Sequence, residues 1–233
     1  MGGLYYYDAN FYYLILVMPM VIFSVIASAK VNSAFKKYSS VFSLRGLTGA
    51  QAAAEVLRYY GISDVEIHHV SGELTDHYDP KTNVIRLSDK VYNSSSVAAI
   101  GVACHEAGHA AQYAQGYSPV KIRTLIYPAC SIGSKLGFPL AIIGFIFSFD
   151  FLVTLGIAFF GLAVLFQILT LPVEFNASRR AIRVIDEIDV LQGEEIYGAR
   201  KVLTAAALTY IASLAVSVAN LLRLVLLANR KRR

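Results

Sequence analysis

The chain has 233 residues, of which 56% are hydrophobic and only 16% are charged, and its formal net charge is +5. That balance is too apolar for an ordinary soluble domain and indicates a membrane protein. The positive charge is spread over segments that flank the apolar runs, without the basic cluster and interleaved aromatics of a nucleic-acid-binding surface. We therefore expect a lipid bilayer as a partner, and no nucleic acid.

The first apolar run covers residues 9–29, close to the roughly 20 residues that cross a bilayer as a helix. No Lys or Arg precedes the run, whereas several basic residues follow it between Lys30 and Arg45. A cleaved secretory signal would have basic residues first. By the positive-inside rule, the sequence predicts an uncleaved anchor with residues 1–8 outside and the following segment in the cytosol.

Residues 30–123 have the mixed composition of a small soluble domain. A helix is predicted from Thr48 and Gln51, which have capping-box spacing, to Gly61. A short strand is predicted over 64–70, and two extended runs flank the turn sequence "DPKTN". We expect these extended segments to form a small antiparallel sheet.

A long helix is predicted over about 95–115, with the preceding serines as N-cap candidates and Gly116 as its end. It contains the sequence "HEAGH" and carries no charge from Ser94 to Cys104, which indicates that this half is buried. The two cysteines, Cys104 and Cys130, do not make a disulfide framework. We interpret both as buried free thiols.

Beyond residue 123 the chain is apolar again, and the stretch over 136–173 is too long for one span. A charge at the centre of a span costs about 2.5 to 3.5 kcal/mol, so Asp150 is expected at an outer turn. This turn separates a span over 131–149 from a span over 151–173. A cytosolic helix is expected over 174–201.

A fourth apolar run covers 202–222, and the basic tail 223–233 follows it. Either this run crosses the membrane against the positive-inside rule, or it lies along the membrane and leaves the tail in the cytosol. We favour crossing. The expected fold class is mostly α: a polytopic membrane protein with a small α+β cytosolic domain.

The "HEAGH" sequence has the spacing of a metal-binding helix. His105 and His109 lie four residues apart, so both imidazoles lie on one helical face and can bind one zinc ion. A catalytic zinc site adds a third protein ligand and leaves a fourth position for water, whose proton the adjacent Glu106 is placed to take. Alternatively the histidines are a surface pair, but the surrounding helix is apolar, and burial without partners would cost on the order of several kcal/mol.

Glu174 is the stronger candidate for the third ligand, because it lies where the third span returns to the cytosol. No histidine follows "HEAGH" at a short spacing. From the residues alone, an interfacial carboxylate paired with Arg179 or Arg180 is an equal alternative.

Four stretches of the sequence, "DHYDPKTNVIRLS", "VYNSSSVAAIGVACHE", "HEAGHAAQ" and "PVEFNASRRA", occur in this order. Together they resemble the YugP-type family of membrane-bound neutral zinc metallopeptidases, over about residues 30–201. The resemblance implies a zinc-dependent endopeptidase of a bacterial cytoplasmic membrane with its active site facing the cytosol. It also implies His105, His109 and Glu174 as zinc ligands and Glu106 as the general base.

A more distant similarity, to the HtpX class of membrane peptidases, also supports Glu174. The third ligand of that class opens an ExxAD pattern, and here "EFNAS" keeps Glu174 and Ala177 at the same spacing. Ser178 replaces the aspartate. We therefore expect Asn176 or Ser178 to take over the orientation of a ligating histidine.

Besides zinc, candidates for stabilising the oxyanion of peptide hydrolysis are Tyr113, Arg179 and Arg180, with His77 a weaker one. The alternatives are a packed tyrosine, arginines that extend to the membrane surface and a polar turn residue. The extended "NVIRLS" run could offer an edge to which a peptide substrate adds as a strand.

Two functions are compatible with these features. The favoured one is a membrane-bound zinc endopeptidase that acts on peptide or membrane-protein substrates; the oligomeric state stays open. The other is a non-catalytic membrane scaffold with a structural metal site. Structural zinc sites close the fourth position with Cys or His, and Cys104 faces about 100° away from His105 on the helix, which disfavours the scaffold.

Overall fold

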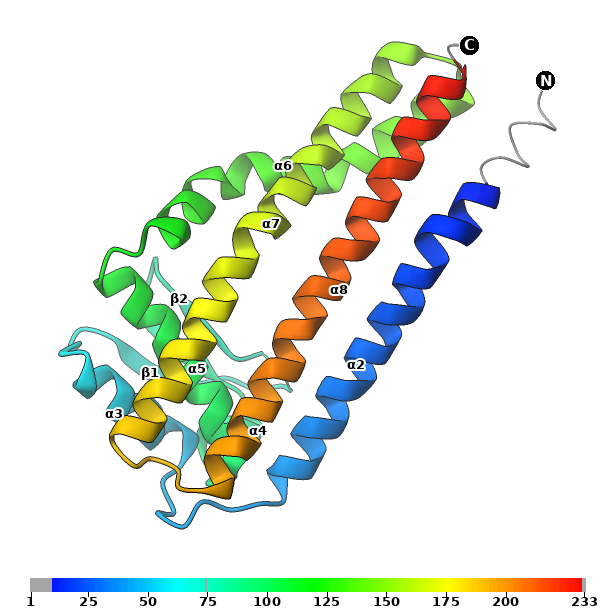
Figure 1. Ribbon diagram of the computed structural model, residues 1–233. Helices are drawn as coiled ribbons and strands as arrows, with labels where there is room; N and C mark the ends of the chain where they lie inside the picture. The colour runs from blue at the N-terminus through cyan, green and yellow to red at the C-terminus, as the bar shows by residue number, and fades with distance from the viewer. Residues whose placement is uncertain (1–9, 74, 232–233) are drawn as a thin grey trace. The chain divides into compact units, whose positions relative to one another are not determined.

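The computed structural model describes residues 10–73 and 75–231. Figure 1 follows the chain from α2 (Met18–Ser39) in blue to α8 (Glu194–Lys231) in red. The chain divides into two units. The long helices α7 (Asp150–Glu187) and α8 contribute residues to both of them.

The first unit consists of apolar helical segments from residues 10–28, 122–171 and 209–231. In it the π-helical turn η1 (Tyr13–Val17) leads into α2, and α6 (Ser118–Ile146) turns directly into α7. Helices α6 and α7 pack closely through small residues: a Cβ added at Gly137 would lie 2.5 Å from the backbone nitrogen of Phe160. Close contact at small residues is typical of helix packing in membranes.

Four of the described helices are long and apolar enough to cross a bilayer: Asn10–Ser39, Ser118–Ile146, Asp150–Glu187 and Glu194–Arg230. The predicted spans over 131–149, 151–173 and 202–222 each lie almost wholly within one of these helices. Asp150 stands at the first position of α7, just after the turn. The predicted outer segment 1–8 and residue 9 lie outside the described residues.

Two helix boundaries differ from the expected ones. The helix predicted over 174–201 is divided at 188–193, where Asp189 and Gly193 have φ values of +54° and +52°. Residues in this left-handed conformation cannot continue a helix. Helix α7 therefore runs unbroken from the apolar run to Glu187, and α8 continues through the predicted tail to Lys231.

The second unit contains residues 29–121 and 172–208, and two of its helices, α3 (Gly49–Tyr59) and α5 (Val97–Ala114), begin close to where the sequence predicts. The short helix α4 (Asp89–Tyr92) was not predicted. At the start of α3, Thr48 and Gln51 form the predicted capping box. The helix α5 contains "HEAGH", and the hydroxyl of its N-cap Ser96 accepts a hydrogen bond from the backbone N–H of Ala99.

The sheet of the second unit has three strands in the order β1, β3, β2, formed by Glu66–His69, Val84–Leu87 and His77–Asp79. The prediction of an antiparallel sheet is only half right: β2 pairs antiparallel to β3, but β1 pairs parallel to it. The strand β3 has three buried apolar residues, so it takes the central position. The "NVIRLS" run thus has both edges occupied, and the expectation that it offers an edge to substrate is wrong.

One hydrophobic core holds these elements together. It contains Val56 of α3, Ile85 of β3, Ile100 of α5 and Ile185 of α7, none of which is exposed to solvent. Cys104 belongs to this core, and both Cys104 and Cys130 are buried free thiols, as predicted.

Candidate metal centre

The helix α5 brings the two histidines of "HEAGH" together. The rings of His105 and His109 lie edge to face with centroids 4.7 Å apart. Most of the helix is buried, including Ala107 and Gly108 between the histidines and Glu106 beside them. The motif is therefore part of the core, and the surface pair of histidines is not what the structure shows.

A glycine inside the motif lets α7 approach α5. A Cβ added at Gly108 would lie only 2.6 Å from the carbonyl oxygen of Ala177, so no larger residue fits without a shift of backbone. Glu174 precedes Ala177 by three residues, about one helical turn, and so projects from the same side of α7. The close contact between the helices places its carboxylate opposite the two imidazoles.

His105, His109 and Glu174 form a group with the geometry of a metal site. The Glu174 Oε2 atom lies 3.4 Å from His105 Nε2 and 3.5 Å from His109 Nε2. Two ligands that are each about 2.0–2.1 Å from a tetrahedral zinc ion lie about 3.3–3.4 Å from one another. The donor atoms, two imidazole nitrogens and a carboxylate oxygen, thus fit zinc in spacing and in kind.

The second nitrogen of each imidazole is also held. The hydroxyl of Ser178 lies 3.1 Å from His105 Nδ1, and the side-chain oxygen of Gln112 lies 3.1 Å from His109 Nδ1. A partner at Nδ1 fixes the orientation of the ring and leaves Nε2 for the metal. Of the two residues expected to orient a ligating histidine, Asn176 and Ser178, it is Ser178 that contacts an imidazole directly.

Gln112 is a site residue that the sequence reasoning missed. It is completely buried, and its amide nitrogen donates hydrogen bonds to the backbone oxygen of Val173 at 2.7 Å and to Asn176 Oδ1 at 2.9 Å. Gln112 therefore connects His109 on α5 to the segment of α7 that carries Glu174. Its position three residues after His109, on the same helical face, is the signal that could have revealed it.

Glu106 is 8% exposed and is held by the sheet. Its Oε2 accepts a hydrogen bond of 2.9 Å from the backbone N–H of Tyr78 in β2. Burial alone would lower the pKa of His109, but its hydrogen bond to Glu174 and the charges of Glu106 and Glu174 outweigh that effect and raise the pKa.

The other predicted residues lie around this centre. Asn176 accepts hydrogen bonds from Gln112 and from Arg180 Nε, and Arg180 also contacts Gln115. The ring of Tyr113 packs 5.6 Å from that of Tyr78.

Two of the predicted residues have no described contact with the three-residue group. Arg179 is exposed. His77 is exposed in β2, where its Nδ1 pairs with the backbone oxygen of Thr75. His77 is thus a strand residue and not the expected turn residue. Glu174 contacts the two histidines, in place of the predicted alternative in which it pairs with Arg179 or Arg180.

Cys104 does not belong to the ligand group found among the described residues. Burial raises the pKa of its thiol, which opposes formation of the thiolate that binds zinc. Three protein ligands without a fourth are typical of catalytic zinc sites.

Comparison with known proteins agrees with this site. The family model described as "Putative neutral zinc metallopeptidase" matches residues 13–229. A protein of Bacillus subtilis (strain 168) named "Putative membrane protease YugP" is 45% identical over 201 residues, which are 86% of this chain and 89% of that protein. No solved structure matches the chain. The family and the three-residue group together indicate zinc as the cofactor.

Proposed function

The chain belongs to the neutral zinc metallopeptidase family, and from this premise we propose that it is a membrane-bound endopeptidase with Glu106 as general base. One observation carries the proposal. His105, His109 and Glu174 meet with the spacing of zinc ligands, while the buried carboxylate of Glu106 lies beside them without joining the group.

When bound, zinc supplies Lewis-acid chemistry that activates a water molecule and polarises the carbonyl of the scissile peptide bond. Glu106 accepts the proton of the attacking water and then delivers it to the leaving amine. The hydrogen bond from the Tyr78 N–H fixes Oε2 of this carboxylate. The other oxygen, Oε1, is the atom to which we assign the proton transfer.

Ser178 and Gln112 serve as positioning residues. The Ser178 hydroxyl and the Gln112 side-chain oxygen each accept a hydrogen bond from the Nδ1–H of one imidazole. This selects the tautomer whose Nε2 lone pair is available as a ligand. Asn176 supports the arrangement through its bond to Gln112.

Oxyanion stabilisation by the protein is assigned to Tyr113. It lies on the helical face of His109, one turn further along α5, and its ring packs against Tyr78, whose backbone holds Glu106. A tyrosine hydroxyl can donate a hydrogen bond to a developing oxyanion. Tyr113→Phe should then reduce the rate constant of cleavage without changing zinc content.

The scaffold alternative predicts a closed metal site. Neither cysteine belongs to the ligand group that the described residues form, so nothing fills the fourth position that a structural site closes with Cys or His. The side chains of His105 and His109 are also 14% and 12% exposed, so they are not completely buried. These features favour catalysis.

We further propose that the protein resides in a bacterial cytoplasmic membrane, with the site on its cytosolic surface. The basic residues that follow the first span support this orientation. Glu174 lies one residue beyond the apolar run over 151–173. Segments of peptides or membrane proteins that emerge at the bilayer surface are the substrates that such a site would meet.

The experiment that tests this function compares zinc content with cleavage of a labelled peptide library, using detergent-purified wild type, Glu106→Gln and Glu174→Ala. Glu106→Gln should keep its zinc and lose activity by a factor of about 10² to 10⁴. Glu174→Ala should lose zinc. The matched control is Glu55→Gln, which neutralises a glutamate whose described partner is the exposed Arg58.

If Glu106→Gln cleaves like wild type while zinc is retained, the metal is structural and the endopeptidase proposal is wrong. If Glu174→Ala keeps its zinc, Glu174 is not a ligand.

A further inference from the structure

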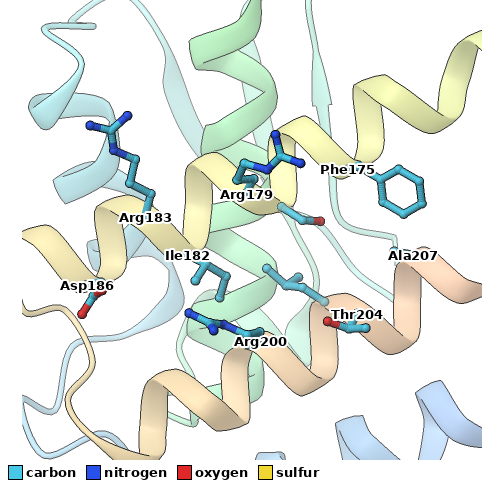
Figure 2. Close-up of a pocket in the computed structure, with 10 residues that line it drawn as sticks. Phe175, Arg179, Ile182, Arg183, Asp186, Arg200, Thr204 and Ala207 are labelled. Carbon is cyan, nitrogen blue, oxygen red and sulfur yellow. The ribbon is translucent and has the colours of Figure 1, made fainter.

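A groove of about 560 Å³ lies between α7 and α8 in the second unit (Figure 2). The α7 residues that line it recur every three to four positions, and so do those of α8. Each helix therefore contributes one face. The groove does not include His105, His109 or Glu174.

The two ends of the groove differ in polarity. Figure 2 shows Phe175 and Ala207 at one end and Asp186 at the other, with the side chain of Arg200 lying between the helices. Phe175 follows closely on the apolar run of α7, and Ala207 lies within the apolar run of α8. Along both helices, the apolar end of the groove thus adjoins the membrane-spanning sequence.

The polar part of the groove is positively charged. Arg179, Arg183 and Arg200 line it, against the single carboxylate of Asp186. Arg183 is paired with Glu187 at 2.7 Å. In the part of the chain that the structure describes, neither Arg179 nor Arg200 makes an ion pair, and Arg179 is exposed. Two arginines are therefore available to an anionic ligand.

We propose that this groove binds one anionic phospholipid, with the phosphate on Arg200 and Arg179 and an acyl chain along Leu203 towards Phe175 and Ala207. Guanidinium groups bind phosphate through paired charge-assisted hydrogen bonds, and basic pockets at the ends of membrane helices are known to hold lipid headgroups. An acidic peptide would satisfy the arginines but would leave the apolar end uncovered. The lipid satisfies both ends.

The test uses the full-length protein in nanodiscs with a phosphatidylglycerol probe that carries a photoreactive diazirine in one acyl chain. After illumination, mass spectrometry should locate the crosslink near Phe175 or Ala207. Unlabelled phosphatidylglycerol should compete with the probe, and phosphatidylcholine should not. Loss of two arginine–phosphate contacts in the Arg179→Gln/Arg200→Gln variant should weaken probe binding at least tenfold.

The matched control is Arg58→Gln/Lys81→Gln, which removes the same charge from exposed residues outside the groove. A second variant, Thr204→Phe, fills the groove from an exposed position and changes no charge. It should also reduce the crosslink. Lipid binding needs neither zinc nor Glu106, so Glu106→Gln should bind the probe like wild type.

Crosslinks spread over many sites, equal competition by phosphatidylcholine, or equal labelling of the arginine variant and its control would overturn the proposal. Displacement of the probe by an acidic peptide but not by phosphatidylglycerol would also overturn it, and would identify the groove as a peptide site. None of these results depends on cleavage activity, so the endopeptidase proposal is tested separately.

Discussion

Replacement of Gly108 by alanine tests whether the contact between α5 and α7 sets the metal site. The added Cβ would lie 2.6 Å from the carbonyl oxygen of Ala177, and ordinary contact begins at 3.4 Å, so the helices must separate by about 0.8 Å. Both partners of this contact are helix backbone, which cannot rotate away. Metal ligands tolerate errors of only about 0.2 Å, so the shift should move Glu174 out of its ligand position.

The expected effects on stability and on zinc differ in size. Overpacking of this kind costs about 1–3 kcal/mol, and alanine regains about 1 kcal/mol over glycine in a helix. The net loss of unfolding free energy should therefore be about 0–2 kcal/mol. Zinc affinity should fall at least 10- to 100-fold, the usual effect of disturbing groups around the ligands.

The assay is a zinc titration against a competing chelator in detergent, together with thermal unfolding. The matched control, Gly101→Ala, lies on the same helix, where a Cβ would meet that of Ala199 at 3.4 Å, an ordinary contact. This control should bind zinc like wild type and be unchanged or slightly more stable. If Gly108→Ala also binds zinc like wild type, the close helix contact does not position the ligand.

Further predictions concern the groups around the site and the effect of pH. Gln112→Leu should lower zinc affinity about 10- to 100-fold, whereas Gln112→Glu keeps an acceptor for His109 and should lose less in the same titration. Because the pKa of His109 is raised, the proton that competes with zinc is lost only above the usual pKa of about 6.5. Zinc affinity should then increase with pH through that range. The zinc-free protein should instead become less stable as pH rises, because it loses the stabilisation of the protonated imidazole. Calorimetry at several pH values would show this as a fall in its melting temperature. Hydrogen bonds from Thr82, the Lys81 N–H and Arg86 lower the pKa of Asp79, so Asp79→Asn should reduce the melting temperature at pH 7. That difference should shrink as pH falls below the usual pKa of about 3.9 and vanish once pH is below the lowered pKa of the folded protein, and a difference that persists in stronger acid would contradict this origin.

Much of the local structure was predictable because its causes lie within a few residues. The capping box at Thr48 and Gln51 and the serine cap of α5 formed as expected, because each depends on neighbouring side chains. The sheet was predictable only in part. Which strand takes the centre depends on burial against α5, and no single strand specifies whether its neighbour runs parallel or antiparallel.

The sequence alone predicts that the two histidines can share one metal ion, because a spacing of four residues on a helix gives them a common face. It also determined the apolar runs, since their length and composition are local properties. The tertiary structure was needed to see that Glu174 lies with the two histidines, and that Gln112 contacts His109 and the backbone of Tyr78 contacts Glu106. Gln112 lies only three residues from His109, but its bonds to Val173 and Asn176 and the other contacts join residues 28 to 69 positions apart. These long-range contacts arise from the packing of α7 and β2 against α5, which no local pattern encodes.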